Sequence, residues 1–214
     1  MRQLSLLDRL LNEVDQSMRT VYAGAPASTR SVVPENLTKK PDLSDAERKH
    51  AASLMRINHA GEVAAQGLYR GQAMNAKNPV VKQQMAESAA EENDHLNWCE
   101  ARLDALDSHK SLLSPLWYWG SFSIGAIAGA AGDRWSLGFV KETEDQVSQH
   151  ISRHLEKLPE ADTVSRDVLL QMQADEQHHA EVAEAAGAAK LPFPIRKVLM
   201  PLTSKVMTRL SAKI

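Results

Sequence analysis

The sequence has one cysteine, few aromatic residues and little net charge, and each shortage excludes a class of protein. Cys99 alone cannot form an internal disulfide or a cysteine-rich zinc or rubredoxin-type site, and it suits a reducing compartment. A net charge of −2 gives no basic field to recruit nucleic acid, so we expect no nucleic-acid partner. Aromatic residues make up 5% of the chain, and Val, Ile and Thr form no alternating runs, which favours a mostly helical fold.

The nine prolines leave four long intervals in which helices can form, because proline inside a helix costs roughly 3 kcal/mol. Ser44 and Glu47 have the spacing of a capping box, and Asn78 before Pro79 is typical of a helix start. The predicted helices cover residues 44–75, 78–107, 133–158 and 162–187. The sequence therefore predicts an all-α protein built on a four-helix bundle.

Further segments lie outside this bundle, which we assign to a domain at 44–187. Residues 1–43 are predicted to hold a short amphipathic helix over 1–22 and then a linker. Residues 188–214 are predicted to form a basic amphipathic C-terminal helix. The fold would thus have additional N- and C-terminal helices.

Residues 111–132 carry no charge and form a long apolar crossover between the second and third predicted helices. Pro115 and the glycines that follow weaken this stretch as a membrane span, so we interpret it as dipping into a membrane without crossing it. A buried connecting helix is the alternative. Residues 190–214 carry six basic residues and no acidic one, which suits an anionic membrane surface, although packing against the bundle is also compatible. We expect a peripheral location on the cytoplasmic face of the cell membrane.

Each bundle helix carries one glutamate near the middle of its apolar stripe, and these glutamates match in depth. Glu62 and Glu92 are equally distant from residue 77, in the turn between the first two helices. Glu144 and Glu176 are likewise equally distant from residue 160. In an antiparallel hairpin, equal distance from the turn means equal height along the bundle. The carboxylates should therefore meet their partners across each hairpin.

Buried carboxylates that meet would repel one another unless a positive charge lies between them, and no Lys or Arg occupies the central parts of these stripes. His95 and His179 each follow a glutamate by three residues, which places both side chains on one helical face. Such pairs are usually solvated, but two in equivalent places are hard to explain in that way. Four glutamates and two histidines, with a Glu-x-x-His motif on each of two helices, form the ligand set of ferritin-like di-iron and di-manganese carboxylate proteins. The predicted metal ligands are Glu62, Glu92, His95, Glu144, Glu176 and His179.

Other polar residues near these positions receive weaker predictions. His150 and Tyr69 could approach the cavity, with a satisfied core position as the default for either. His59 and Cys99 are expected to pack in the core. Five residues adjoin ligands in sequence but point to other faces, where they would be solvated or would support the ligands: Glu91, Asp94, Glu142, Asp145 and His178.

Four motifs together resemble those of the di-iron demethoxyubiquinone (demethoxyubiquinol) hydroxylases of ubiquinone biosynthesis, in their bacterial form. They are RINHAGEVAAQGLYRGQ at 56–72, EENDHL at 91–96, GFVKETEDQVSQHI at 138–151 and DEQHHAEVA at 175–183. The resemblance implies a ferritin-like bundle, two iron ions per chain and the same six ligands. It also matches His150 to a histidine that the family keeps near the site. Animal members have glutamate where this chain has Asp145, which we do not count as a ligand.

The resemblance implies a monooxygenase that hydroxylates the ring of a polyprenyl methoxy-methyl benzoquinol with O2, the second oxygen atom leaving as water. Implied partners are O2, the lipid substrate, a membrane surface and other ubiquinone-biosynthesis proteins; the electron donor and the oligomeric state stay open. One alternative is an iron-storage or oxidant-scavenging protein of the ferritin or manganese-catalase kind, which leaves 111–132 unexplained. Another is a non-catalytic membrane adaptor with a structural metal. A rubrerythrin-like peroxidase is disfavoured because one cysteine cannot bind its additional iron.

Overall fold

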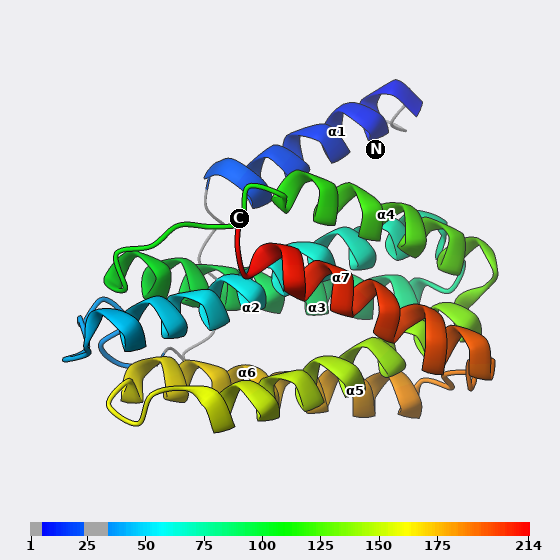
Figure 1. Cartoon of the computed structure of the whole chain (residues 1–214). Helices are drawn as coiled ribbons and strands as arrows, with labels where there is room; N and C mark the ends of the chain where they lie inside the picture. The colour runs from blue at the N-terminus through cyan, green and yellow to red at the C-terminus, as the bar shows by residue number, and fades with distance from the viewer. Residues whose placement is uncertain (1–5, 24–33) are drawn as a thin grey trace.

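Two antiparallel helical hairpins form the bundle in a computed structural model of the chain, which describes residues 6–23 and 34–214 (Figure 1). The hairpins are α2 with α3 and α5 with α6. Their helices span Asp45–Asn75, Pro79–Ala105, Asp133–Lys157 and Thr163–Ala185, respectively. Contacts between α2 and α5 and between α3 and α6 close the ring of four helices. The predicted all-α four-helix bundle is confirmed.

The bundle helices begin where local sequence signals place them. The Ser44 hydroxyl accepts a hydrogen bond from the Glu47 amide, and the Glu47 carboxylate accepts one from the Ser44 amide at 2.9 Å, which completes the capping box of α2. Asn78 accepts a bond from the Val80 amide at the start of α3, next to Pro79. These bonds satisfy amides that have no partner within the helix.

Two hydrophobic clusters fill the bundle and leave a polar layer between them. One cluster centres on Met55, Leu103 and Ile151, and the other on Tyr69 and Leu137. The inward faces of these helices are mostly buried; Ser88 on α3 and Val147 on α5 are half-buried, and Ala186 is exposed because it lies past the end of α6. The glutamates of the stripes lie between the two clusters, away from solvent.

The apolar segment between α3 and α5 forms α4 (Ser114–Ala130), which packs along α2. Glycines allow this close approach. A Cβ at Gly125 would overlap the carbonyl oxygen of Leu68, and a Cβ at Gly71 would overlap that of Phe122. The outer side of α4 leaves Leu116 and Ile127 exposed, so the helix is only partly buried. Across residues 6–23 and 34–214, none of the helices combines the length and the apolar character that a membrane crossing requires.

Replacing Gly125 with alanine is expected to lower the free energy of unfolding by about 2–3 kcal/mol, because the new methyl group meets backbone that cannot rotate away. Gly120 is a matched control on the same helix, since a Cβ there meets nothing within 4 Å. Gly120→Ala should be neutral or stabilising by up to about 1 kcal/mol, as in any helix interior. Chemical denaturation of both variants tests this, and equal stability would contradict the close α2–α4 packing.

The terminal helices lie against the outside of the bundle (Figure 1). Near the N-terminus, α1 (Leu6–Met18) continues into a π-helical turn, η1 (Arg19–Ala23). Its polar side faces α2, where Glu13 and Arg70 form two hydrogen bonds of 2.8 Å. Leu7 and Leu11 point outward and are exposed. The remainder of the predicted N-terminal helix and linker, at 1–5 and 24–33, lies outside the described residues.

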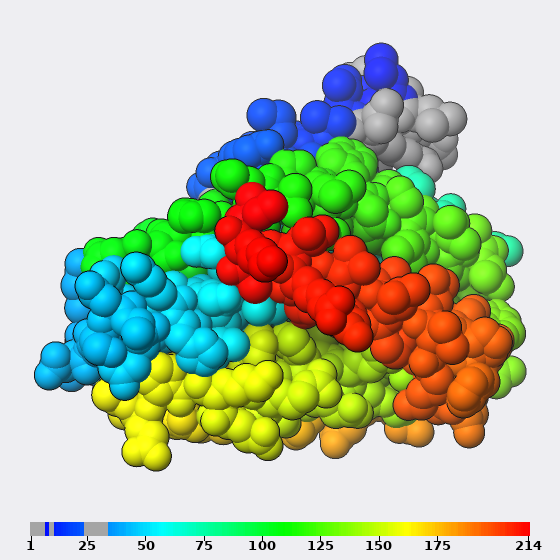
Figure 2. Space-filling model, in the orientation of Figure 1, coloured from blue at the N-terminus to red at the C-terminus, as the bar shows by residue number. Residues whose placement is uncertain are grey.

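At the C-terminal end, the π-helical turn η2 (Ile195–Leu199) leads into α7 (Met200–Ser211). This helix crosses the face of the molecule beside α4 (Figure 2). Its C-cap carbonyl, on Ala212, accepts hydrogen bonds from Ser53 and Arg56 of α2. The basic tail therefore packs on the bundle, while an apolar row stays exposed: Val198, Leu199, Leu202, Val206 and Leu210.

Candidate metal centre

Four predicted ligands from three helices meet in the polar layer of the bundle. Glu62 comes from α2, Glu92 and His95 from α3, and Glu176 from α6. Each of these four buried residues offers one ligand atom, and those atoms all lie within 4.8 Å of one another. The equal-depth argument predicted the meeting of Glu62 and Glu92 within their hairpin.

Two carboxylates lie between the two histidines. Glu92 directs Oε2 to Nδ1 of His95 at 3.0 Å and Oε1 to Nδ1 of His179 at 3.5 Å. Glu176 directs Oε1 to His95 at 3.3 Å and Oε2 to His179 at 3.2 Å. Glu92 and Glu176 thus each present one oxygen atom to each imidazole. Carboxylates in this position can offer oxygen ligands to a cation bound beside the histidines.

Glu144 on α5, also a predicted ligand, is not among the four residues whose ligand atoms lie within 4.8 Å of one another. Its Oε1 accepts a 2.6 Å hydrogen bond from the hydroxyl of Tyr69. Burial, followed by the charges of Glu176 and Glu92, raises the pKa of Glu144 well above its usual value, so the carboxylate lies within their field. Tyr69 is therefore beside the cluster, and its hydroxyl fixes the orientation of the Glu144 carboxylate.

The electrostatics of the cluster show a surplus of negative charge. Burial, then the charges of Glu176 and Glu62, raises the pKa of Glu92 well above its usual value. Burial opposes ionisation of Glu176, but hydrogen bonds from His179 and His95 outweigh it and lower the pKa of Glu176 to about 2. Burial likewise opposes protonation of His179, but hydrogen bonds to Glu176 and Glu91 outweigh it and raise the pKa of His179 to about 11. Protonated imidazoles thus supply the positive charge that metal ions would replace, and metal binding should release protons.

A second pair of carboxylates holds the histidines from outside the cluster. Nε2 of His95 lies 2.9 Å from Asp175 on α6, and Nε2 of His179 lies 2.6 Å from Glu91 on α3. Each histidine therefore bonds to a carboxylate of the opposite hairpin, which fixes the ring and points Nδ1 into the cluster. Glu91 is one of the five residues for which the sequence predicts a solvated or supporting position. Asp175 was missed, although an acidic residue precedes Glu-x-x-His in both helices.

The other polar residues singled out in the sequence lie away from the ligands. Cys99 is buried in the core beside Met172, as predicted. His59 is buried and lies 3.4 Å from Glu100, so it packs next to a different carboxylate. His178 is exposed. Glu142 lies 3.7 Å from Arg196, and Asp145 pairs with Lys141 at 2.8 Å.

Asp175→Asn is expected to weaken metal affinity by roughly 10–100-fold, because the amide cannot stabilise the His95 ring as a carboxylate does. Asp167 on the same helix is a matched control, and Asp167→Asn should leave the affinity unchanged. Competition against a coloured chelator measures the affinity. Equal affinities for the two variants would show that Asp175 does not support the site.

An apolar cavity of about 370 Å³ reaches the cluster from one side. Glu62 lies on its wall, together with Asn58 and His150. The rest of the wall comes mostly from apolar residues of α2, α4, α5 and α7. His150 packs edge-on against His154, with ring centroids 4.0 Å apart. His150 therefore approaches the site as predicted, because it lines the same cavity as Glu62. Within the described part of the chain, no hydrogen bond joins His150 to a predicted ligand.

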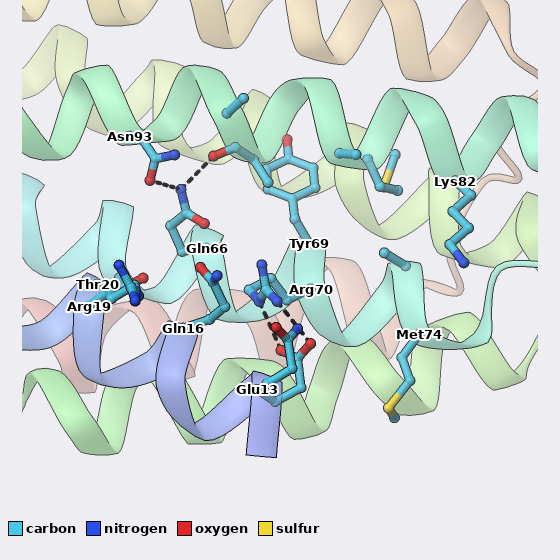
Figure 3. Close-up of a pocket in the computed structure, with 16 residues that line it drawn as sticks. Glu13, Gln16, Arg19, Thr20, Gln66, Tyr69, Arg70, Met74, Lys82 and Asn93 are labelled. Atoms are coloured by element: carbon cyan, nitrogen blue, oxygen red, sulfur yellow. Dashed lines mark hydrogen bonds and ion pairs between the residues drawn. The ribbon is translucent and has the colours of Figure 1, made fainter. Parts of the chain in front are cut away.

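A polar cavity of about 550 Å³ lies on the other side, between α1, α2 and α3 (Figure 3). Tyr69 lines it beside Gln66, which donates a hydrogen bond of 2.9 Å to Asn93. The Glu13–Arg70 pair lies in its wall. The cluster is thus flanked by an apolar cavity at Glu62 and a polar one at Tyr69.

Comparison with known proteins gives a consistent result over nearly the whole chain. The sequence model of the family described as "Ubiquinone biosynthesis protein COQ7" matches residues 49–211. A "3-demethoxyubiquinol 3-hydroxylase" of Legionella pneumophila is 53% identical over 212 residues, 99% of each chain. Proteins of the same name from Nitrosococcus oceani and Acinetobacter baumannii are 51% and 49% identical. The match to the Nitrosococcus protein covers 97% of this chain and 96% of the relative, and the match to the Acinetobacter protein covers 99% of each.

Proposed function

Because the chain belongs to the COQ7 family of ubiquinone biosynthesis proteins, we propose that it hydroxylates the ring of a polyprenyl demethoxyubiquinol with O2 at a centre of two iron ions. The family predicted from the four motifs is confirmed by these matches. The observation that carries the proposal is the buried group of Glu62, Glu92, His95 and Glu176 beside an apolar cavity.

The residues of the cluster fit a pair of divalent cations. The buried Oε1 atom of Glu92 has no hydrogen-bond partner among the described residues. Oxygen and imidazole donors without thiolate suit iron or manganese, and the family favours iron. One ion would be held by Glu62 and His95, and the other by Glu144 and His179. Glu92 and Glu176, which each approach both histidines, would complete the set of residues that holds the ions.

The reaction converts a ring C–H, O2, two electrons and two protons into a ring C–OH and water. When bound, reduced iron would supply electrons to O2. The chain's own residues hold this chemistry in place: Tyr69 fixes the Glu144 carboxylate, and Asp175 and Glu91 fix the two histidines. The hydrophobic clusters on either side exclude water from the cluster.

The apolar cavity would receive the quinol ring next to Glu62. Its outer wall includes Leu116 and Ile124 of α4 and Met207 of α7, so an isoprenoid tail could leave between these helices. Exposed apolar side chains continue outward on both helices, among them Ile127 and Leu202. With the basic residues of the tail, this surface suits an anionic bilayer. We therefore place the protein peripherally on the cytoplasmic face of the membrane, where its lipid substrate is.

Iron loading followed by an assay in lipid tests this function. Purified protein is loaded with ferrous iron, supplied with a chemical reductant and O2, and mixed with vesicles that contain demethoxyubiquinol. We expect about two irons per chain and a product heavier by one oxygen atom, which derives from labelled O2. Iron binding and O2 consumption without this product would support the storage or scavenging alternative instead.

A further inference from the structure

Three residues that line the apolar cavity each carry a buried polar atom with no hydrogen-bond partner among the described residues. The atoms are Nδ2 of Asn58 on α2, Nε1 of Trp117 on α4 and Nε2 of His150 on α5. Buried polar atoms are nearly always hydrogen-bonded, because each orphan costs about 1–3 kcal/mol. Three such atoms on residues that line one cavity, each from a different helix, indicate a ligand that satisfies them.

The orientation of Asn58 is fixed by a neighbour. Nδ1 of His154 lies 3.2 Å from Oδ1 of Asn58, and an amide oxygen can only accept, so the imidazole donates to it. The Asn58 side chain is 4% exposed. With its oxygen occupied, the amide has its N–H₂ group left for the cavity. His154 in turn packs against His150.

The donor and acceptor pattern limits the chemistry of the ligand. The Asn58 amide nitrogen and the Trp117 indole nitrogen can only donate, so the ligand must offer acceptor oxygens to them. The His150 ring can donate or accept. Burial lowers the pKa of His150 to about 4, so the ring is neutral at pH 7. None of the described residues lining the cavity is Lys or Arg, which disfavours a phosphate or carboxylate head group. A neutral aromatic ring with several oxygen substituents fits this pattern.

We propose that Asn58, Trp117 and His150 position the substrate ring through its hydroxyl and methoxy oxygens, and that they reject rings without those oxygens. This inference rests on the proposed function, because it deepens the description of the same site. Asn58 lies one helical turn before Glu62, so a ring held by these groups would lie beside the cluster. A site whose buried donors would be left unpaired discriminates strongly against analogues that lack the acceptors.

Two probes separate positioning from simple packing. The first is a short-chain methoxy-methyl hydroquinone, and the second is the same ring with its oxygen groups replaced by methyl groups. Anaerobic calorimetric titration of the iron-loaded protein prevents turnover. Wild type should bind the oxygenated ring at least about a hundredfold more tightly than the methylated ring. Asn58→Leu and Trp117→Phe should each lose about tenfold of affinity for the oxygenated ring only.

A matched control is Ser123→Ala on α4, an exposed residue outside the lining of this cavity whose hydroxyl donates to the Trp119 carbonyl at 2.9 Å. It should bind both probes as wild type does. His150→Phe keeps an aromatic contact with His154 and removes both ring nitrogens, including the unpartnered Nε2, so its melting temperature should not fall while its affinity for the oxygenated ring does.

Equal losses for the two probes would show that these residues merely support the cavity, and unchanged binding of both would also overturn the assignment. In either case wild-type hydroxylation in vesicles would leave the proposed function intact. An iron-loaded wild type that hydroxylates neither the vesicle substrate nor the short-chain ring would overturn the proposed function itself.

Discussion

Glu92→Gln is expected to remove metal binding and to reduce hydroxylation by about a thousandfold or more, while making the metal-free protein more stable. Glu92 contacts both histidines, so its loss removes a carboxylate from both proposed metal positions. The amide has one acceptor oxygen and no charge, and it cannot bridge two cations. Metal analysis and vesicle assays measure the loss.

The gain in metal-free stability follows from the pKa of Glu92. Burial and neighbouring carboxylates raise this pKa in the folded state above its unfolded value near 4.5. At neutral pH the Glu92 carboxyl ionises more readily in the unfolded chain than in the folded one, and this difference lowers the free energy of unfolding. At acid pH the carboxyl is protonated in both states, so this destabilisation disappears. Glutamine has no such penalty, so the variant should gain about 1–3 kcal/mol at pH 7 and little at pH 4.

Glu87 provides the control for this change, because it is exposed on the same helix and bonds only to the nearby Gln83. Glu87→Gln should keep both irons, full activity and wild-type stability. A Glu92→Gln protein that still binds two irons would contradict the assignment of the cluster. A metal-free variant less stable than wild type at pH 7 would show that repulsion does not dominate the empty site.

A double change on α7, Leu202→Glu with Val206→Glu, is expected to separate lipid binding from chemistry. Both side chains are about half exposed and belong to the apolar row beside α4. Burying each in a bilayer contributes about 1.5–3 kcal/mol, and the new charges are repelled by anionic lipid. Binding to anionic vesicles and turnover of the polyprenyl substrate should each fall at least about tenfold. Turnover of a short-chain soluble substrate should stay within about twofold of wild type.

The matched control changes one leucine and one valine to glutamate on helices away from α7. Leu170 on α6 and Val80 on α3 are exposed to a similar degree, and neither helix packs on α7. Leu170→Glu with Val80→Glu should retain vesicle binding. If both double variants bind vesicles as wild type does, the surface of α4 and α7 is not the membrane-facing side. Equal losses of lipid and soluble turnover in the α7 variant would instead show damage to the cavity.

Much of the site could be predicted because helical geometry is local. The spacing of three residues between glutamate and histidine sets their common face, and distance from a turn sets height in a hairpin. These two facts pair Glu92 with His95 and match Glu92 in depth to Glu62, and the structure places all three within one cluster. Helix starts were predictable for the same reason, since a cap such as Ser44 bonds only to the next turn.

The outer partners of the histidines could not be predicted in this way. Asp175 bonds to His95 from a different hairpin, and the Tyr69 hydroxyl reaches Glu144 across the bundle. Spacing fixes the direction of a side chain around its own helix axis. It does not fix how far two helices are apart or how each is rotated toward the other. Those quantities depend on the packing of every residue between them.

The sequence by itself determined the four helices, their buried faces and the residues able to bind metal, because each depends on a period or a cap within one segment. Tertiary structure alone decided which carboxylates support the histidines, that glycines bring α4 onto α2, and that α1 turns its polar side toward the bundle. It also decided that Asn58, Trp117 and His150 share one cavity. Contacts of this kind join residues far apart in the chain, and only the relative placement of whole helices creates them.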